Sequence, residues 1–370
     1  MFTPTKNETT TQLLHEWYRE IRARRIDNAR HLKEQADALI QGLKEEESEV
    51  TRDNNVLLYY TLLDFRFNYL INHLGVSKDS FDRVEQFNIP SDNFLSYYYH
   101  FFKAIHCDAI GNYSLAKEHY YKAEELLKFV PDELEQAEFY YKLGYSYYEN
   151  QQGLLSIKEV TKAKNIFSKY EDHEINVAFC DNILGLACTY LREWELAEEH
   201  YTSAMDKFQK IGEEKFILMV RHNLGWMYAT QNLNDLAIRY LTEVVEKSPQ
   251  HYKAVYVKAK VHYKLEQHEI ARELIERGLK ISNELSLEEY QHRNEILKAM
   301  NDNSSAEELE KVVLAGIRYF DREELYDNVQ EYYEILGAKC HEDDLYKKAS
   351  EYFYSGMQAK KKAFEKGALK

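Results

Sequence analysis

The chain has few of the residues that interrupt or cross-link a fold. Its 370 residues include only 4 Pro, 13 Gly and 4 Cys. So little Pro and Gly leaves few breaks between elements, and we expect helix to dominate. The cysteines form no Cys-x-x-Cys pair and are sparse for this length, which is typical of reduced core residues in a cytosolic protein. They are Cys107, Cys180, Cys188 and Cys340.

Long apolar runs and excess positive charge are also missing. No run of about 18 apolar residues occurs, so we expect no segment to span a membrane. The start, MFTPTKNETTTQ, has no apolar core and is not expected to be a signal peptide. The 48 Lys and Arg stand against 63 Asp and Glu, a net charge of −15. Such an acidic chain is a poor candidate for non-specific binding to nucleic acid or membranes.

The motifs of common catalytic sites are absent from the sequence. There is no H-E-x-x-H, no P-loop, no G-x-S-x-G and no dinucleotide-binding glycine motif. The 14 His are scattered, and none is spaced with Cys as a pair of metal ligands. We therefore expect a binding protein with no metal site and no cofactor of its own.

What the chain does contain is a ladder of small residues. Six times a small residue is followed twelve positions later by another, and four positions after that by a large apolar residue. This is the spacing of the tetratricopeptide repeat (TPR), a pair of antiparallel helices. The small residues let neighbouring helices approach, and the large residue fills the gap between them. The six pairs are Ala104–Ala116, Gly144–Ser156, Gly185–Ala197, Gly225–Ala237, Ala259–Ala271 and Gly337–Ala349.

The spacing of these pairs predicts one more repeat. Their first residues are 40, 41, 40 and 34 positions apart, and then 78 positions separate the last two. The wide gap leaves room for a hidden repeat near Ala299. The residue twelve positions beyond Ala299 is Lys311, so either this repeat is degenerate or its register is wrong. We predict an all-α fold with about seven repeats in a right-handed TPR superhelix.

A three-helix bundle is predicted before the repeats. Apolar residues recur at helical spacing over residues 12–41, and residues 56–74 form a strongly apolar helix that Gly75 ends. Residues 76–92 mix charge, Ser and one Pro, and we interpret them as a linker that contains at most a short helix. The predicted domains are a helical head at 1–75, a linker at 76–92 and a repeat domain at 93–370.

Two other functions fit a TPR array. A peptide-responsive transcription regulator needs a DNA-reading head, but residues 1–75 hold ten Lys and Arg against twelve Asp and Glu. They also have no Gly before Gly42 to form the tight turn of a helix-turn-helix. A generic TPR scaffold that docks partner tails without a switch is the other alternative.

Several short segments resemble one known family. These are L-H-E-W-Y at 14–18, L-Y-Y-T-L at 58–62 with F-R at 65–66, and E-Q-A-E-F at 135–139. They are similar to segments of the Rap proteins, the response-regulator aspartate phosphatases of Bacillus and its relatives. The resemblance covers nearly the whole chain.

The resemblance implies a cytoplasmic regulator with two protein partners. Rap proteins bind a bacterial response regulator with the head and adjoining repeats, and either hydrolyse its aspartyl phosphate or sequester it. A short signalling peptide is secreted and re-imported for quorum sensing. It binds inside the repeat superhelix and inhibits the Rap protein. The resemblance thus points to pathways such as sporulation and competence.

The resemblance also implies how a Rap phosphatase hydrolyses the aspartyl phosphate of the response regulator. The receiver domain supplies the acyl phosphate and Mg²⁺, and one amide of the Rap head orients a water in line with phosphorus. That amide belongs to a Gln in Rap phosphatases, and the matching residue here is Asn54, one methylene shorter. An insertion of about two helical turns lies beside it, around residues 44–52. Both departures leave open whether the chain is an enzyme, and Asn54 alternatively caps the following helix.

The resemblance also places two residues at the partner surface. Phe65 matches a family residue that packs against the regulator, although it fits a position in the bundle core equally well. Asp53, next to Asn54, is assigned to the same partner-binding surface.

The peptide-binding groove is predicted from repeat geometry. The first helix of each pair lines the concave surface, most directly at the residue after the Gly, the residue four later and the residue two before the Gly. The resemblance implies that Asn223 holds the peptide backbone with its amide. At Tyr190 the family has an Asp, which implies altered peptide specificity or none. The groove residues are Tyr145, Glu149, Leu186, Tyr190, Asn223, Trp226 and Thr230.

Overall fold

The computed structural model describes residues 6–46, 54–89 and 91–367, and these form helices and short 3-10 turns with no strand. The head helices are α1 (Lys6–Arg22), α2 (Ile26–Glu46) and α3 (Asn54–Ile71), followed by the short η1 (His73–Gly75), η2 (Lys78–Phe81) and α4 (Asp82–Glu85). The repeat helices are α5 (Asn93–Ala109), α6 (Tyr113–Leu127), α7 (Glu133–Glu149), α8 (Gly153–Phe167), α9 (Glu174–Tyr190), α10 (Trp194–Ile211), α11 (Glu214–Thr230), α12 (Asn234–Lys247), α13 (Tyr252–Lys264), α14 (His268–Glu284), α15 (Glu288–Asn301), α16 (Ala306–Arg322), α17 (Tyr326–Glu342) and α18 (Tyr346–Gly367).

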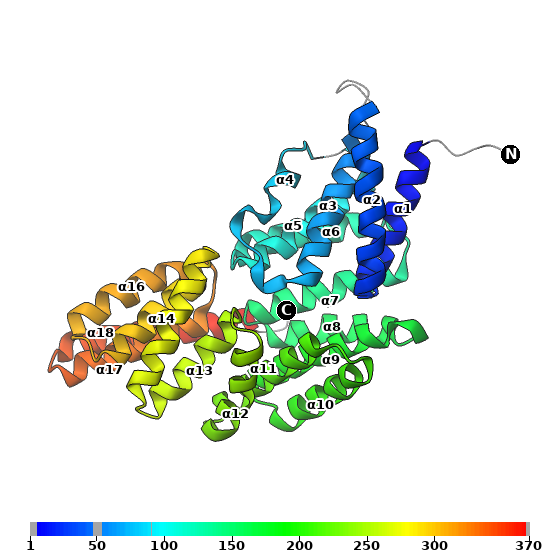
Figure 1. Ribbon diagram of the computed structural model, residues 1–370. Coiled ribbons are helices and arrows are strands. Elements are labelled where there is room, and N and C mark those ends of the chain that lie inside the picture. The colour runs from blue at the N-terminus through cyan, green and yellow to red at the C-terminus, as the bar shows by residue number, and fades with distance from the viewer. Residues whose placement is uncertain (1–5, 47–53, 90, 368–370) are drawn as a thin grey trace.

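The helices from α5 to α18 form seven antiparallel pairs wound into a right-handed superhelix, with the head packed beside the first pairs (Figure 1). This confirms the predicted all-α TPR fold. Each of the seven turns within a pair holds one residue with positive φ, seven positions after the ladder residue. These residues are Gly111, Gln151, Arg192, Asn232, Glu266, Asn303 and Asp344.

The ladder residues are small because the partner helix leaves them no room. A Cβ added at Gly185 would lie 2.6 Å from the ring of Tyr201, the large residue sixteen positions later. A Cβ at Gly225 would lie 2.7 Å from Leu241 in the same relative position. Since real Cβ atoms do not approach so closely, these pairs require glycine at this helix–helix contact.

The hidden sixth repeat is α15–α16, and its register differs from the one placed at Ala299. Its ladder residue is Ile296, which stands seven positions before Asn303. A large residue is tolerated at Ile296 because it packs over Gly316 of α16, with 2.9 Å between its Cδ1 and the position of an added Cβ. The turn is also one residue longer, and Ser305 and Glu308 close it with a capping box. The repeat is therefore out of register with Ala299, and it is also degenerate, because the large residues Ile296 and Leu309 stand where the other repeats have small ones.

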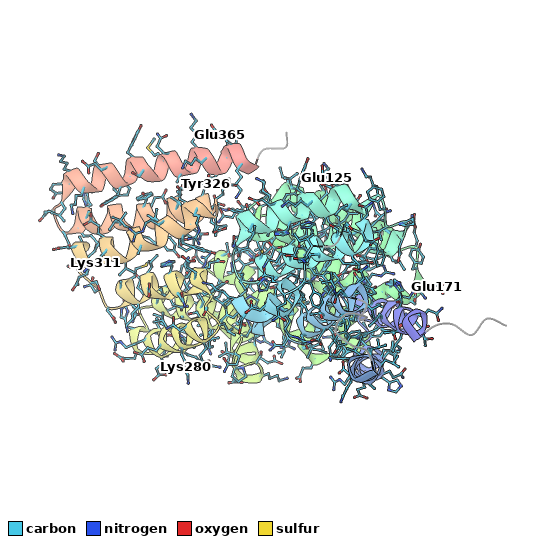
Figure 2. The ribbon with its side chains drawn as sticks, turned by 90° about the horizontal axis from the view of Figure 1, so that it is seen from above. Glu125, Glu171, Lys280, Lys311, Tyr326 and Glu365 are labelled. Atoms are coloured by element: carbon cyan, nitrogen blue, oxygen red, sulfur yellow. The ribbon has the colours of Figure 1, made fainter. Side chains whose placement is uncertain are left out.

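The superhelix closes on itself, so that its last repeats contact its first. Tyr113 at the start of α6 donates its hydroxyl to Glu289 of α15 at 2.7 Å. Tyr319 of α16 donates to the backbone oxygen of Gly111 at 2.6 Å. Figure 2 shows α18, with Glu365 near its end, running beside α17, which begins at Tyr326.

The head and the first repeats share one hydrophobic core. It runs from Leu14 and Trp17 of α1 through α3 and α5 to Leu143 of α7. The segment at 76–92 belongs to it as well, since Phe81 is fully buried and forms part of the same cluster. The head therefore has no core separate from that of the first repeats. The predicted division into 1–75, 76–92 and 93–370 stays a prediction.

All four cysteines are free and buried. Within residues 6–46, 54–89 and 91–367, no helix has the length and apolar character needed to cross a bilayer.

Candidate functional site

The superhelix encloses a cavity of about 1090 Å³. Its wall is formed by the first helices of the pairs, from α7 to α17, and on one side by the head through Arg24 and Arg66. The first helices face inward because their second helices cover them on the outside, as the repeat geometry predicts. An occupant of this cavity would therefore touch the head and the repeats at once.

Every groove residue predicted from the repeat register lies on the cavity wall. The same register, extended to the other pairs, also accounts for wall residues that the sequence analysis did not name. At two positions before the ladder residue these include Lys142 and Val257, and at one and five positions after it they include Lys260 and Lys264. The predicted wall residues are Tyr145, Glu149, Leu186, Tyr190, Asn223, Trp226 and Thr230.

Asn223 is engaged with the neighbouring helix. Its Nδ2 donates to Oδ1 of Asn182 on α9 at 2.8 Å, and both side chains are buried. Asn182 also lines the cavity and was not predicted. The two amides form a polar patch on an otherwise apolar stretch of wall, where Trp226 packs edge-on to Tyr148 at 6.1 Å between ring centroids. The role of Asn223 in holding a peptide stays a prediction.

Tyr190 spans the cavity to the last repeat. Its hydroxyl donates to Oδ2 of Asp327 on α17 at 2.5 Å. Beside it, Gln151 donates to the side chain of Asn328 at 2.8 Å and accepts from the backbone amide of Asp327 at 3.0 Å. Burial, reinforced by the carboxylate of Asp327, raises the pKa of Tyr190. These contacts hold the second and third repeats against the seventh.

Three cations of the cavity wall each pair with a carboxylate, two of them between helices and one within α15. Lys253 of α13 pairs with Glu149 at 2.7 Å, and Tyr145 donates its hydroxyl to the same carboxylate at 2.5 Å. The other two pairs are Lys260–Glu331 at 2.5 Å and Arg293–Glu289 at 2.8 Å.

The wall nearest the head has a different charge balance. Arg24 and Arg66 both contact Glu138 of α7, at 3.0 and 2.7 Å, and all three side chains are buried. Although burial acts in the opposite direction, the two guanidinium groups hold the pKa of Glu138 below its usual range. Lys142, one turn further along α7, has no carboxylate within 4 Å among the described residues.

Three histidines on the wall are neutral at neutral pH. Burial lowers the pKa of His73 to about 3 and that of His251 to about 4. Burial also lowers the pKa of His222, whose ring lies 4.5 Å from that of His251. No cluster of His, Cys, Asp and Glu within the described ranges is arranged to hold a metal ion.

The predicted partner-binding residues lie outside the cavity. Asn54 is exposed and is the first residue of α3, two residues earlier than the predicted helix start. Asp53 lies outside the described residues. Phe65 is buried against Phe81, with 5.0 Å between ring centroids, and against His106. The structure thus shows Phe65 in the core position that the sequence left open, and its contact with a regulator stays a prediction.

A head of three helices, seven TPR pairs and an enclosed cavity define a TPR superhelix whose inner wall is built partly by its own N-terminal head. The family described as "response regulator aspartate phosphatase H, N terminal" matches residues 5–72. The head of this chain is thus similar to the N-terminal region of the Rap family.

Its relatives extend over nearly the full chain. The regulatory protein RapG of Bacillus subtilis (strain 168) is 24% identical over 94% of this chain and 94% of its own. Response regulator aspartate phosphatase I of the same strain is 23% identical over 98% of this chain and 93% of its own. A solved Rap protein complexed with competence and sporulation factor shares the fold, with a TM-score of 0.78 and 23% identity over 97% of this chain and 99% of that one.

Proposed function

We propose that this protein is a cytoplasmic regulator that binds a bacterial response regulator and is inhibited by a short signalling peptide held in the TPR cavity. The cavity carries the proposal, because its wall includes both head and repeats. A peptide bound there would act directly on the position of the head. The Rap relatives support it: one is named a response regulator aspartate phosphatase, and one is solved with a signalling factor.

The volume and chemistry of the cavity suit a peptide of about five residues. A space of about 1090 Å³ exceeds that of a typical small-molecule pocket. The amides of Asn182 and Asn223 offer donors and acceptors to a peptide backbone, and Trp226 offers an aromatic surface to a side chain. Replacing Asn223 with Ala should weaken a bound peptide by roughly 1–3 kcal/mol.

Whether the protein hydrolyses the regulator's aspartyl phosphate or only sequesters the regulator depends, in this proposal, on Asn54. It is exposed at the start of α3, where an amide can reach a docked receiver domain. If it orients the attacking water, it acts mainly in the transition state, so Asn54→Ala slows dephosphorylation without loosening the complex. Asn54→Gln should then speed the reaction, because the longer side chain restores the reach of the family's Gln.

The test is the half-life of phosphorylated receiver domains from the same cell. Wild type, Asn54→Ala and Asn54→Gln are each added at saturation, and complex formation is measured in parallel by calorimetry. A half-life shortened by wild type and restored by Asn54→Ala, with equal affinity, establishes a phosphatase. An unchanged half-life with retained binding establishes a sequestering regulator. Failure to bind any receiver contradicts the proposed function.

A further inference from the structure

Lys142 is a buried cation that faces the cavity without an ionic partner. Its side chain is only 6% exposed and forms part of the cavity wall. The ammonium lies 4.4 Å from the ring centroid of Tyr69 and 5.3 Å from that of Tyr141. Among the described residues it makes no hydrogen bond. Burial and the neighbouring Arg66 lower the pKa of Lys142, which shows that its surroundings disfavour the charged form.

The groups around Lys142 do not balance its charge. Arg24 and Arg66 already share the one carboxylate of Glu138. The other nearby acid is Asp108, whose pKa burial raises to about 8, so it is neutral at pH 7. Three cations therefore meet one charged carboxylate at this wall. Burying unbalanced charge is costly, and the cost falls when an ion of opposite sign arrives.

The charge of the whole cavity has the same sign. Its wall includes nine Lys and Arg against five Asp and Glu, although the chain carries a net charge of −15. A cavity with this balance, inside a protein of opposite net charge, selects an anionic group over a cationic one.

We propose that the cavity recognises its peptide through a carboxylate that pairs with the ammonium of Lys142 and offsets the charge of Arg24 and Arg66. The inference rests on the proposed function, since it names the chemistry of the same ligand. A C-terminal carboxylate and an Asp or Glu side chain both supply the group.

The pairing also links the ligand to the head. Arg24 and Arg66 belong to the head, and Lys142 belongs to the second repeat. Without a second anion, only the carboxylate of Glu138 offsets these three cations at the junction. A ligand carboxylate between them supplies this second anion, so the peptide holds the head against the repeats.

The test uses two pentapeptide libraries of random sequence, one with free C-terminal carboxylates and one with C-terminal amides. Each is incubated with the full chain, and retained peptides are separated by gel filtration and identified by mass spectrometry. We expect retained peptides to be enriched in carboxylates by at least about tenfold, as a charge-assisted hydrogen bond implies. Loss of retention on amidation assigns the carboxylate to the C-terminus. Enrichment in Asp or Glu at one position of the amidated library assigns it to a side chain.

Three variants separate recognition from structure. Lys142→Met should abolish the enrichment, and Lys142→Arg should preserve it. Lys162→Met is the matched control, because Lys162 also lies over a tyrosine ring, that of Tyr140, but stands on α8 outside the cavity wall and is paired with Glu159, so the carboxylate enrichment should persist. Thermal unfolding shows whether each variant folds, and we expect Lys142→Met to melt no lower than wild type because it removes an unpaired buried cation.

Hydrogen exchange of the α3 amides then tests the link to the head. One retained peptide should increase their protection in wild type and in Lys142→Arg, but not in Lys142→Met. Peptides retained without carboxylate enrichment, or enrichment that survives Lys142→Met, would overturn this inference while leaving peptide binding intact. A retained set that is empty in both libraries would remove the proposed peptide function as well.

Discussion

The two sides of the cavity treat buried charge differently. On the far side, Lys253, Lys260 and Arg293 each have a carboxylate of their own. On the head side, Arg24 and Arg66 share Glu138, and Lys142 has no carboxylate within 4 Å among the described residues. The pairs Lys253–Glu149 and Lys260–Glu331 join helices that are distant in sequence, whereas Arg293–Glu289 lies within α15. The unbalanced charge of the head side can be neutralised by a bound anion. The first arrangement holds the superhelix closed, and the second suits a ligand or a movable head.

The largest effect should follow from removing the shared carboxylate. In Glu138→Gln, Arg24 and Arg66 lose the one charge that both contact, and they stay buried. Stranding buried charges typically costs about 3–5 kcal/mol, and denaturant unfolding should show a loss of that size. Glu133→Gln is the control on the same helix, because Glu133 pairs with Lys169 at the surface, and it should unfold like wild type. Equal stabilities of the two variants would mean that the head-side cluster is solvated rather than buried.

The second prediction uses pH. Folded Asp108 keeps its proton up to about pH 8, whereas in the unfolded chain it ionises at its usual value of 3.8. The folded state therefore binds more protons between these values, so this residue makes stability fall as pH rises through that window and has no further effect above it. Asp108→Asn removes this contribution. Near pH 8 and above it should be more stable than wild type by several kcal/mol, since each unit of pKa shift corresponds to about 1.4 kcal/mol, and at pH 4 the two should converge.

Urea unfolding of both proteins from pH 4 to pH 9 measures this difference. Parallel stability curves would mean that Asp108 is ionised in the folded protein. The head-side wall would then hold a second charged carboxylate, and the contrast between the two sides would be smaller than described.

How much of this was predictable depends on the range of the interaction. The ladder from Ala104 to Ala349 predicted the repeats because close helix approach within a pair is local and demands small residues. It failed at α15–α16, since Ile296 and Leu309 stand where the other repeats have small residues, and Ile296 is accommodated only by its contact with Gly316. The turn insertion before Ser305 then shifted the register of the second helix.

The wall of the cavity divides in the same way. Repeat geometry placed Tyr145, Asn223 and Trp226 on it, and the same position in the second repeat would have identified Lys142. The contact of Tyr190 with Asp327 depends on how far the superhelix closes over several repeats. The local sequence pattern does not determine how closely the third and seventh repeats approach, so the pairings across the cavity could not be predicted. Phe65 remained ambiguous because an aromatic residue suits a core and an interface equally well.

The variant Glu149→Gln tests how much the ion pair of Lys253 and Glu149, on the side of the cavity away from the head, contributes to stability. This change replaces the carboxylate that Lys253 contacts with a neutral amide, so the buried ammonium keeps an acceptor but loses its opposite charge, and it should cost about 1–3 kcal/mol. Adding Lys253→Met should recover much of the loss, because the unpaired cation is then gone. A double variant as unstable as Glu149→Gln alone would show that the pair does not act as a unit.

The smallest effect is expected for Tyr190→Phe, which removes only the hydroxyl that donates to Asp327. The ring still packs on the wall, so the cost should be that of one hydrogen bond, about 0.5–1.5 kcal/mol. The larger consequence should be local, because this bond ties the third repeat to the seventh. Hydrogen exchange in α17 should therefore quicken while exchange in α3, on the head side, stays unchanged. If α3 exchanges faster as well, closure of the superhelix and docking of the head are one cooperative event, and the two sides of the cavity do not act independently.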